Sequence, residues 1–224
     1  MQSQWFFGKT IKGNGNVISK TINTNDYDEV FVTGSFDVKL IHGNEGKIDL
    51  RIEDNLLEYL IIETKEDKLV IKWKKGVNIQ TKKGVFITVP FKDLDKVGLT
   101  GSGDIIANDV IKASHFNTFV SGSGDVVLNI DAHKITSKIT GSGHVELKGN
   151  TDTLNTLVTG SGDFKSYDLK ANNVEATVTG SGDIQIFVSN KLNARVTGSG
   201  DIQYKGNPKY EDLKVTGSGD IESY

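Results

Sequence analysis

The chain contains no cysteine and only two prolines among its 224 residues. Without cysteine there is no disulfide framework, no thiol nucleophile and no cysteine-ligated metal. No apolar run approaches the roughly 18 residues that a membrane span needs. The sequence therefore argues against a membrane span and against every function that depends on thiol chemistry.

A strong excess of charge of either sign is also missing. The 26 basic and 29 acidic residues give a formal net charge of -3 at pH 7. Nucleic-acid binding usually requires a basic face, so we expect no nucleic-acid partner. The first residues, Met1–Trp5, lack the charged and apolar regions of a signal peptide. We expect the N-terminus of a mature exported protein with an added Met, although a cytoplasmic protein could begin with the same sequence.

Glycine, in contrast, is abundant, with 25 residues, and a single repeated motif accounts for more than half of them. A Gly-Ser-Gly tripeptide recurs seven times, at intervals of 21, 19, 19, 20, 18 and 19 residues. Thr or Ser precedes each copy, and Asp follows each copy except the third, where His144 takes its place. The motif glycines are Gly101, Gly103, Gly122, Gly124, Gly141, Gly143, Gly160, Gly162, Gly180, Gly182, Gly198, Gly200, Gly217 and Gly219.

The period of this repeat predicts the fold. About 19 residues are too few for a propeller blade, and nothing in the unit is typical of a helix. Apolar residues and Gly alternate with polar residues through each unit, as the segment Ala176–Val188 shows. Such alternation is typical of half-buried strands. The sequence therefore predicts an all-β fold in which coils of about 19 residues stack into a parallel β-helix, or β-solenoid.

Each motif is predicted to be a bend inside an extended segment. Both glycines are expected to face the core, because no side chain fits inside a tight corner. The Ser and Asp side chains then face solvent. A turn, such as Ser189–Lys191 or Gly206–Pro208, and a returning strand are predicted to complete each coil.

The chain divides into three predicted parts: an N-terminal extension (1–10), a less regular β-rich part (11–92) and the repeat solenoid (93–224). The last two are expected to form one continuous unit. The segment Thr33–Asp37 matches the motif with Phe36 at the second glycine, which predicts a degenerate, broader coil. Further predictions are strands at Leu69–Trp73 and Val85–Val89, a hairpin turn at Lys65–Lys68 and one helical turn at Glu53–Glu58.

The repeated Asp residues are the candidate metal ligands. If the coils are in register, they form a column with neighbours about 4.8 Å apart. A hard cation such as calcium could bridge these carboxylates, or they could be solvated or accept backbone N–H bonds. Neighbouring carboxylates at this spacing repel each other by only roughly 0.8 kcal/mol in water. The column is therefore stable without a bound cation, and we expect neither a metal nor a cofactor. The candidates are Asp163, Asp183, Asp201 and Asp220.

No catalytic residue is predicted. Seven copies of one Ser indicate a structural role. The acidic residues recur with the repeat, whereas a lyase or hydrolase would place them at non-repeating positions.

The Thr and Ser residues that precede the motif form a flat polar column, which ordinary cross-strand pairing explains. Flat Thr arrays on β-solenoids can also order ice, but Lys138 and Arg195 interrupt such a surface here. The four histidines have no metal-ligand spacing and are predicted to be structural: His42, His115, His133 and His144.

Exposed aromatic side chains could stack on sugar rings. The densest group is the N-terminal trio, which could instead cover an edge of the molecule. The candidates are Trp5, Phe6, Phe7, Trp73, Phe119, Phe187 and Tyr224.

The combined motifs resemble the family called putative auto-transporter adhesin head domain, or GIN domain. The resemblance rests on the Gly-Ser-Gly-Asp repeat together with the segments Gly13–Val17, Val32–Leu40 and Glu53–Leu60, and it extends from about residue 11 to the end. It implies a right-handed parallel β-helix-like fold and an exported protein, in the periplasm or at the outer surface of a Gram-negative bacterium. It carries over no catalytic residues.

Three functions remain open at this point. The first is a non-enzymatic binding or adhesion module, whose partner is a glycan or a protein surface. The second is a structural cell-envelope scaffold without a ligand, and the third is a carbohydrate-active β-helix enzyme. The sequence assigns no binding residues. Because the segment Asp220–Tyr224 stops within a coil, the last edge is expected to be bare or covered by another copy of the chain.

Overall fold

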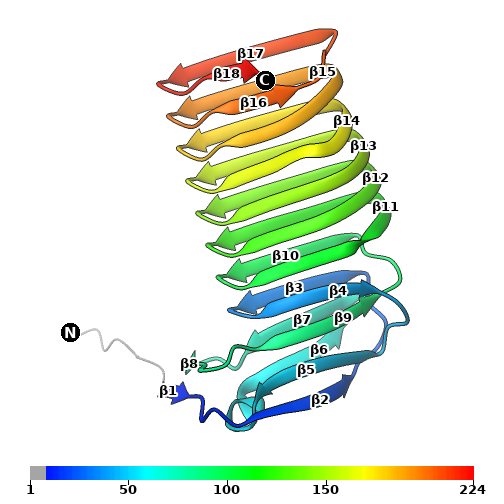
Figure 1. Ribbon diagram of the computed structural model, residues 1–224, viewed down its shortest axis with the longest axis vertical. Helices are drawn as coiled ribbons and strands as arrows, with labels where there is room; N and C mark the ends of the chain where they lie inside the picture. The colour runs from blue at the N-terminus through cyan, green and yellow to red at the C-terminus, as the bar shows by residue number, and fades with distance from the viewer. Residues whose placement is uncertain (1–8) are drawn as a thin grey trace, which may run out of the picture.

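The computed structural model describes residues 9–224, in which about seven coils stack into a β-solenoid (Figure 1). Coils follow one another about every 19 residues, which confirms the predicted fold. Sixteen strands belong to one sheet that wraps around the stack, and two short strands form a separate sheet at its base. Among these residues no helix is long and apolar enough to cross a bilayer.

The repeat strands pair in parallel with matching positions opposite one another. The first glycines of successive motifs, for example Gly122 and Gly141, are register partners. The strands are β10 (Lys96–Gly101), β11 (Asp104–Gly122), β12 (Asp125–Gly141), β13 (His144–Gly160), β14 (Asp163–Gly180), β15 (Ile184–Gly198), β16 (Ile202–Lys205), β17 (Tyr210–Gly217) and β18 (Ile221–Ser223).

Each coil has two flat faces joined by a narrow corner at the Gly-Ser-Gly motif and by a wide bend on the opposite side (Figure 1). The long strands pass around the wide bend without ending. The predicted turn at Ser189–Lys191 is therefore wrong, because β15 continues through it and stays paired with β14, with a register shift. The predicted turn at Gly206–Pro208 is confirmed as the loop between β16 and β17.

The narrow corner is built by backbone contact between coils. The carbonyl of Gly160 accepts the N–H groups of both Ser181 (2.8 Å) and Gly182 (3.1 Å) in the next coil. A Cβ atom on Gly182 would lie 2.0 Å from the carbonyl oxygen of Gly162. The sequence predicted crowding inside the corner, whereas the main obstacle is the backbone of the preceding coil.

Within the largely apolar interior of the solenoid, three buried hydroxyl groups form a column. Thr118, Ser137 and Thr156 are register partners on three successive coils, and each is at most 4% exposed. Their hydroxyl oxygens have no hydrogen-bond partner. In contrast, the hydroxyl of buried Thr151 lies 3.2 Å from the carbonyl oxygen of His133. A buried hydroxyl without a partner reduces stability.

The first coil lies within the N-terminal part. Gly34 is the register partner of Gly101, and Asp37 that of Asp104, which confirms the predicted degenerate coil. Phe36 is fully buried at the second glycine position and packs against Trp73. The elements here are β2 (Val17–Asn23), β3 (Glu29–Gly34), β4 (Asp37–His42), β5 (Lys47–Glu53), the 3-10 helix η1 (Asp54–Tyr59), β6 (Leu60–Lys65), β7 (Lys68–Trp73) and β9 (Phe86–Phe91).

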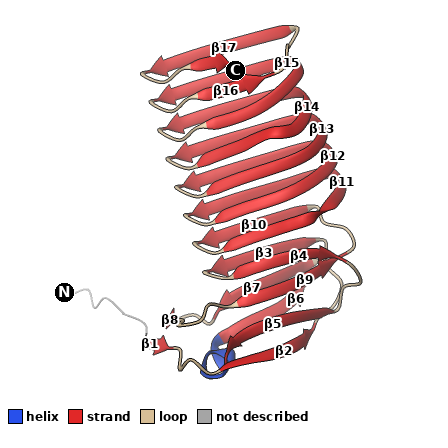
Figure 2. Cartoon of the chain, in the orientation of Figure 1, coloured by secondary structure: helices blue, strands red, loops and turns tan. Residues whose placement is uncertain are grey.

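Antiparallel strands close the lower end of the stack (Figure 2). On one face β6 pairs with β7, and on the other β5 pairs with β2 and β9. The predicted strands, the hairpin turn between β6 and β7 and the helical turn are thus confirmed. Because β3 and β4 hydrogen-bond to β10 and β11, we propose that residues 11–92 and 93–224 are one folding unit.

A buried carboxylate fastens the base of this lower end. Glu53 is fully buried, and its two oxygens accept the backbone N–H groups of Gly15 (2.6 Å) and Lys82 (2.8 Å). Burial by itself would raise the pKa of the Glu53 carboxyl, but these and a further backbone N–H donor, that of Lys83, outweigh it and lower the pKa. These bonds tie the segments that follow β1 (Lys9–Lys12) and β8 (Val77–Gln80) to one acidic side chain.

Replacing Thr156 with Val is expected to stabilise the protein by about 1 kcal/mol, because the change removes a buried hydroxyl group without a partner and keeps the shape of the side chain. The matched change Thr151→Val, which removes a bonded hydroxyl, is expected to destabilise it by about 1 kcal/mol. Chemical denaturation of both variants measures the difference. A loss of stability in Thr156→Val would show that its hydroxyl is satisfied.

Candidate functional site

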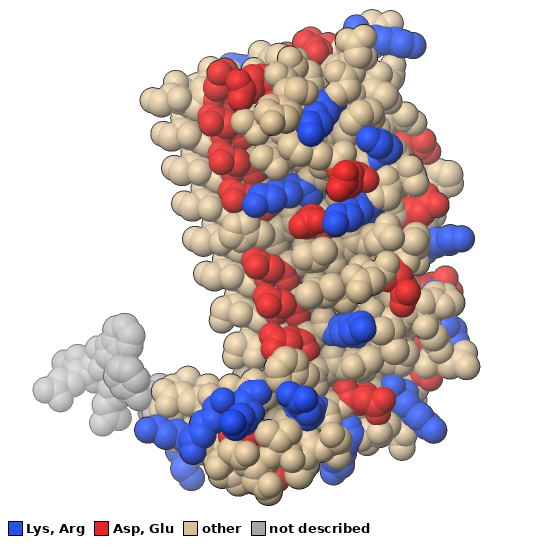
Figure 3. Space-filling model, in the orientation of Figure 1, with Lys and Arg blue, Asp and Glu red and all other residues tan. Residues whose placement is uncertain are grey.

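Acidic side chains line the narrow corner from coil to coil, and they appear as a red column in Figure 3. Four of its carboxylates accept the backbone N–H of the equivalent residue in the next coil: those of Asp125, Asp163, Asp183 and Asp201. The donors Asp201 and Asp220 lie 2.9 Å and 2.8 Å from the Oδ1 atoms of Asp183 and Asp201. The column is thus ordered by backbone hydrogen bonds. Within residues 9–224, no three acidic or histidine side chains gather in a geometry that would hold a metal ion.

His144 takes the place of Asp in the column and bridges its neighbours. Its Nδ1 atom lies 3.1 Å from Oδ1 of Asp125, and its Nε2 atom lies 3.2 Å from Oδ2 of Asp163. A doubly protonated imidazole can donate to both carboxylates. His144 therefore links three coils. An Asp at this position would instead add electrostatic repulsion with the carboxylates of Asp125 and Asp163.

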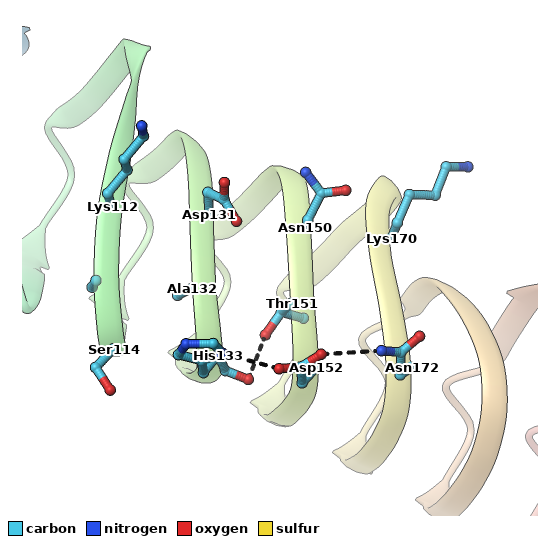
Figure 4. Close-up of a pocket in the computed structure, with 11 residues that line it drawn as sticks. Lys112, Ser114, Asp131, Ala132, His133, Asn150, Thr151, Asp152, Lys170 and Asn172 are labelled. Atoms are coloured by element: carbon cyan, nitrogen blue, oxygen red, sulfur yellow. Dashed lines mark hydrogen bonds and ion pairs between the residues drawn. The ribbon is translucent and has the colours of Figure 1, made fainter.

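A groove of about 780 Å³ crosses the wide bend over four coils, β11 to β14 (Figure 4). Its floor is made of small side chains, including Ala113, Ala132 and Thr151, which are register partners. Two rows of polar side chains border this floor. The first row is Lys112, Asp131, Asn150 and Lys170, and the second is Ser114, His133, Asp152 and Asn172.

Hydrogen bonds between coils order the second row. The carboxylate of Asp152 lies 3.0 Å from Nδ1 of His133 and accepts the side-chain N–H of Asn172 at 3.1 Å. The His133 hydrogen bond, supported by the Asn172 bond and the His133 charge, outweighs partial burial and lowers the pKa of the Asp152 carboxyl. The groove therefore holds fixed hydrogen-bond acceptors beside donors such as the Lys112 ammonium group.

The sequence prediction did not identify this groove. Its members come from four coils and differ in residue type, so no motif marks them. His133 was predicted to be a solvent-facing structural histidine; it is exposed, and it also lines the groove. The only signal is a small residue between two polar ones at the wide bend of each coil, as in Asp131–His133 and Asn150–Asp152.

The predicted sugar-stacking aromatics lie outside the groove. Trp73 packs on Phe36, and Phe119 lies 6.0 Å from Phe31, measured between ring centroids. The Nζ atom of Lys170 lies 4.0 Å from the ring centroid of Phe187. Tyr224 stacks on Tyr167, and Lys205 lies over both rings. The remaining candidates, Trp5, Phe6 and Phe7, lie outside the described residues.

A family model described as "Putative auto-transporter adhesin, head GIN domain" matches residues 26–208. The chain belongs to this family. The predicted family resemblance is thereby confirmed, and the matched range includes the groove and most of the acidic column of this GIN-domain protein. No curated protein matches the chain.

Solved structures share the fold of this GIN-domain protein. A Bacteroides fragilis protein named a putative adhesin has a TM-score of 0.89 at 21% identity, covering 96% of this chain and 100% of that one. A Parabacteroides distasonis protein named a putative lipid binding protein has a TM-score of 0.81 at 28% identity, with the same coverage. A Parabacteroides merdae putative adhesin has a TM-score of 0.75 at 24% identity, covering 96% and 99%.

We propose that the acidic column is structural and does not bind a metal ion. Replacing Asp183 with Ala removes the acceptor for the Asp201 N–H and is expected to cost about 1 kcal/mol, whereas Asp183→Asn keeps an oxygen acceptor and is expected to cost less. Thermal unfolding of both variants, with calcium and with a chelator, measures this. A calcium-dependent rise in the melting temperature that Asp183→Ala abolishes would contradict the proposal.

Proposed function

We propose that this GIN-domain protein is a non-enzymatic binding module of the adhesin type, exported to the periplasm or outer surface of a Gram-negative bacterium, and that the groove at the wide bend binds a glycan chain. Family membership supports the adhesin-like character. Two solved relatives carry the name putative adhesin. The groove supports the ligand class.

The observation that carries this proposal is the pairing of two polar rows with a floor of small residues. Asp131 and Asn150 occupy matching positions on neighbouring coils, and so do Ala132 and Thr151 between the rows. Successive coils are about 4.8 Å apart, so an extended chain of hydroxylated rings can meet one set of donors and acceptors after another. Small floor residues let such a ring approach the backbone.

The enzymatic alternative has less support. Glycoside hydrolysis usually needs one carboxyl group with a raised pKa as general acid. The pKa of the Asp152 carboxyl is instead lowered by the His133 hydrogen bond, so Asp152 is an acceptor in the groove. The scaffold alternative differs from the proposal by requiring no ligand.

Replacing Asn150 and Asn172 together with Ala is expected to weaken glycan binding about tenfold or more, because two hydrogen-bonding groups of the groove are lost. The matched control replaces Asn117 and Asn155, which lie on the flat face outside the groove. A glycan array with purified protein identifies the ligand, and calorimetry measures the affinity of each variant.

Two results would contradict the glycan proposal. Failure of the unaltered protein to bind any glycan favours the scaffold alternative. Equal affinity of the groove and control variants places the ligand elsewhere. Release of shortened sugars from bound polysaccharide would instead favour an enzyme.

We also propose that the upper end of the solenoid pairs with a second copy. Within the described chain, the outer edge of β17 has no neighbouring strand, and the inward positions Leu213 and Val215 are 39% and 40% exposed. Antiparallel pairing of two β17 strands centred on Leu213 would place Asp212 opposite Lys214 twice, with opposite charges facing each other. Edge strands of this kind readily pair with other chains.

The variant Val215→Lys is expected to reduce this self-association, because it places a charge at the apolar edge. Light scattering over a range of concentrations measures the particle mass. Dimers in the unaltered protein and monomers in the variant support the pairing. A monomer at all concentrations in both would contradict it.

A further inference from the structure

Lysine side chains gather at the base of the solenoid, around the small sheet of β1 and β8 (Figure 3). In this sheet Lys9 pairs with Val77 and Lys12 with Gln80, so the sheet places lysines at both of its ends. Two more precede β8 and two follow it. The six exposed lysines of this basic base are Lys9, Lys12, Lys74, Lys75, Lys82 and Lys83.

The small sheet keeps these charges close together. A strand of four residues is roughly 10–13 Å long, so both ends of the sheet lie within about one to two Debye lengths of each other at 0.1 M salt. The Glu53 carboxylate holds the segments that follow both strands of this sheet, through the backbone N–H groups of Gly15 and Lys82. The lysines are thus carried on a fastened element.

The basic base keeps most of its positive charge, although the charge of Lys82 interacts with the Glu53 carboxylate. Within residues 9–224, none of its six lysines forms an ion pair, whereas lysines elsewhere, such as Lys72 and Lys148, do. The preceding residues 1–8 contain no acidic residue in their sequence. The single nearby buried carboxylate, Glu53, already accepts backbone N–H groups.

Charge is also distributed unevenly along the stack. Residues 1–92 contain 14 basic and 12 acidic residues, and residues 93–224 contain 12 and 17, which gives +2 and -5 and agrees with the total of -3. The basic base lies at the lower end of the stack, below the repeat coils and most of their acidic column (Figure 3). A negatively charged surface would attract the base and repel the rest of the rod.

We propose that the basic base docks on an anionic lipid surface and thereby holds the solenoid upright, with the groove and the acidic column directed away from the membrane. The ligand is the layer of lipid phosphates as a surface. Each lysine near such a surface is expected to increase the partitioning of the protein from water to the membrane about fivefold.

The test is flotation of the full chain with vesicles of phosphatidylcholine alone and with added phosphatidylglycerol. The variant K74E/K75E/K82E/K83E reverses four charges of the basic base. The control variant K138E/K165E/K191E/K209E makes the same change in net charge on exposed lysines of the repeat coils. Melting temperatures confirm that both variants remain folded.

We expect the unaltered protein and the control variant to float only with anionic vesicles, and high salt to release them. The base variant is expected to bind at least about tenfold more weakly. Equal binding of the two variants, or equal binding to both vesicle types, would overturn the proposal. Complete competition by dilute inorganic phosphate, or by a nucleic-acid duplex, would also overturn it, since the ligand would then be a free phosphate or a different polyanion.

Discussion

The structure depends on direct backbone stacking at the narrow corner. There the carbonyl of one motif glycine accepts N–H groups of the next coil, as Gly160 does for Ser181 and Gly182. The space between neighbouring corners is too small for a Cβ atom, which explains why glycine recurs at two positions in every repeat coil. This contact fixes the register, and the register then aligns every other position in the stack.

Both candidate surfaces follow from that register. The acidic column arises because one Asp per motif recurs at the same corner, where its carboxylate accepts the next backbone N–H, as in Asp183 and Asp201. The groove arises at the opposite bend, where small floor residues such as Ala132 leave room between polar rows. The lower end departs from the repeat: Phe36 replaces a glycine, and antiparallel strands close the stack.

Much of the fold could be predicted from the sequence because it is periodic. The motif spacing and the alternation through Ala176–Val188 report strand direction and the buried face without any long-range information. The path of the chain at the wide bend was harder to predict. Ser189–Lys191 has the composition of a turn, whereas β15 continues through it with a shift in its register against β14. The groove and the Glu53 contact could not be predicted, since each joins side chains from segments whose spatial relation appears only after folding.

Replacing Gly182 with Ala and measuring the midpoint of chemical denaturation tests whether backbone stacking at the narrow corner holds the coils together, with Ser181→Ala at the adjacent exposed position as the control. The added Cβ would lie 2.0 Å from the Gly162 carbonyl oxygen. Backbone stacking predicts a loss of more than about 3 kcal/mol for Gly182→Ala, at the upper end of single substitutions, and almost none for Ser181→Ala. A loss below about 0.5 kcal/mol for Gly182→Ala, the range of surface substitutions, would contradict the account.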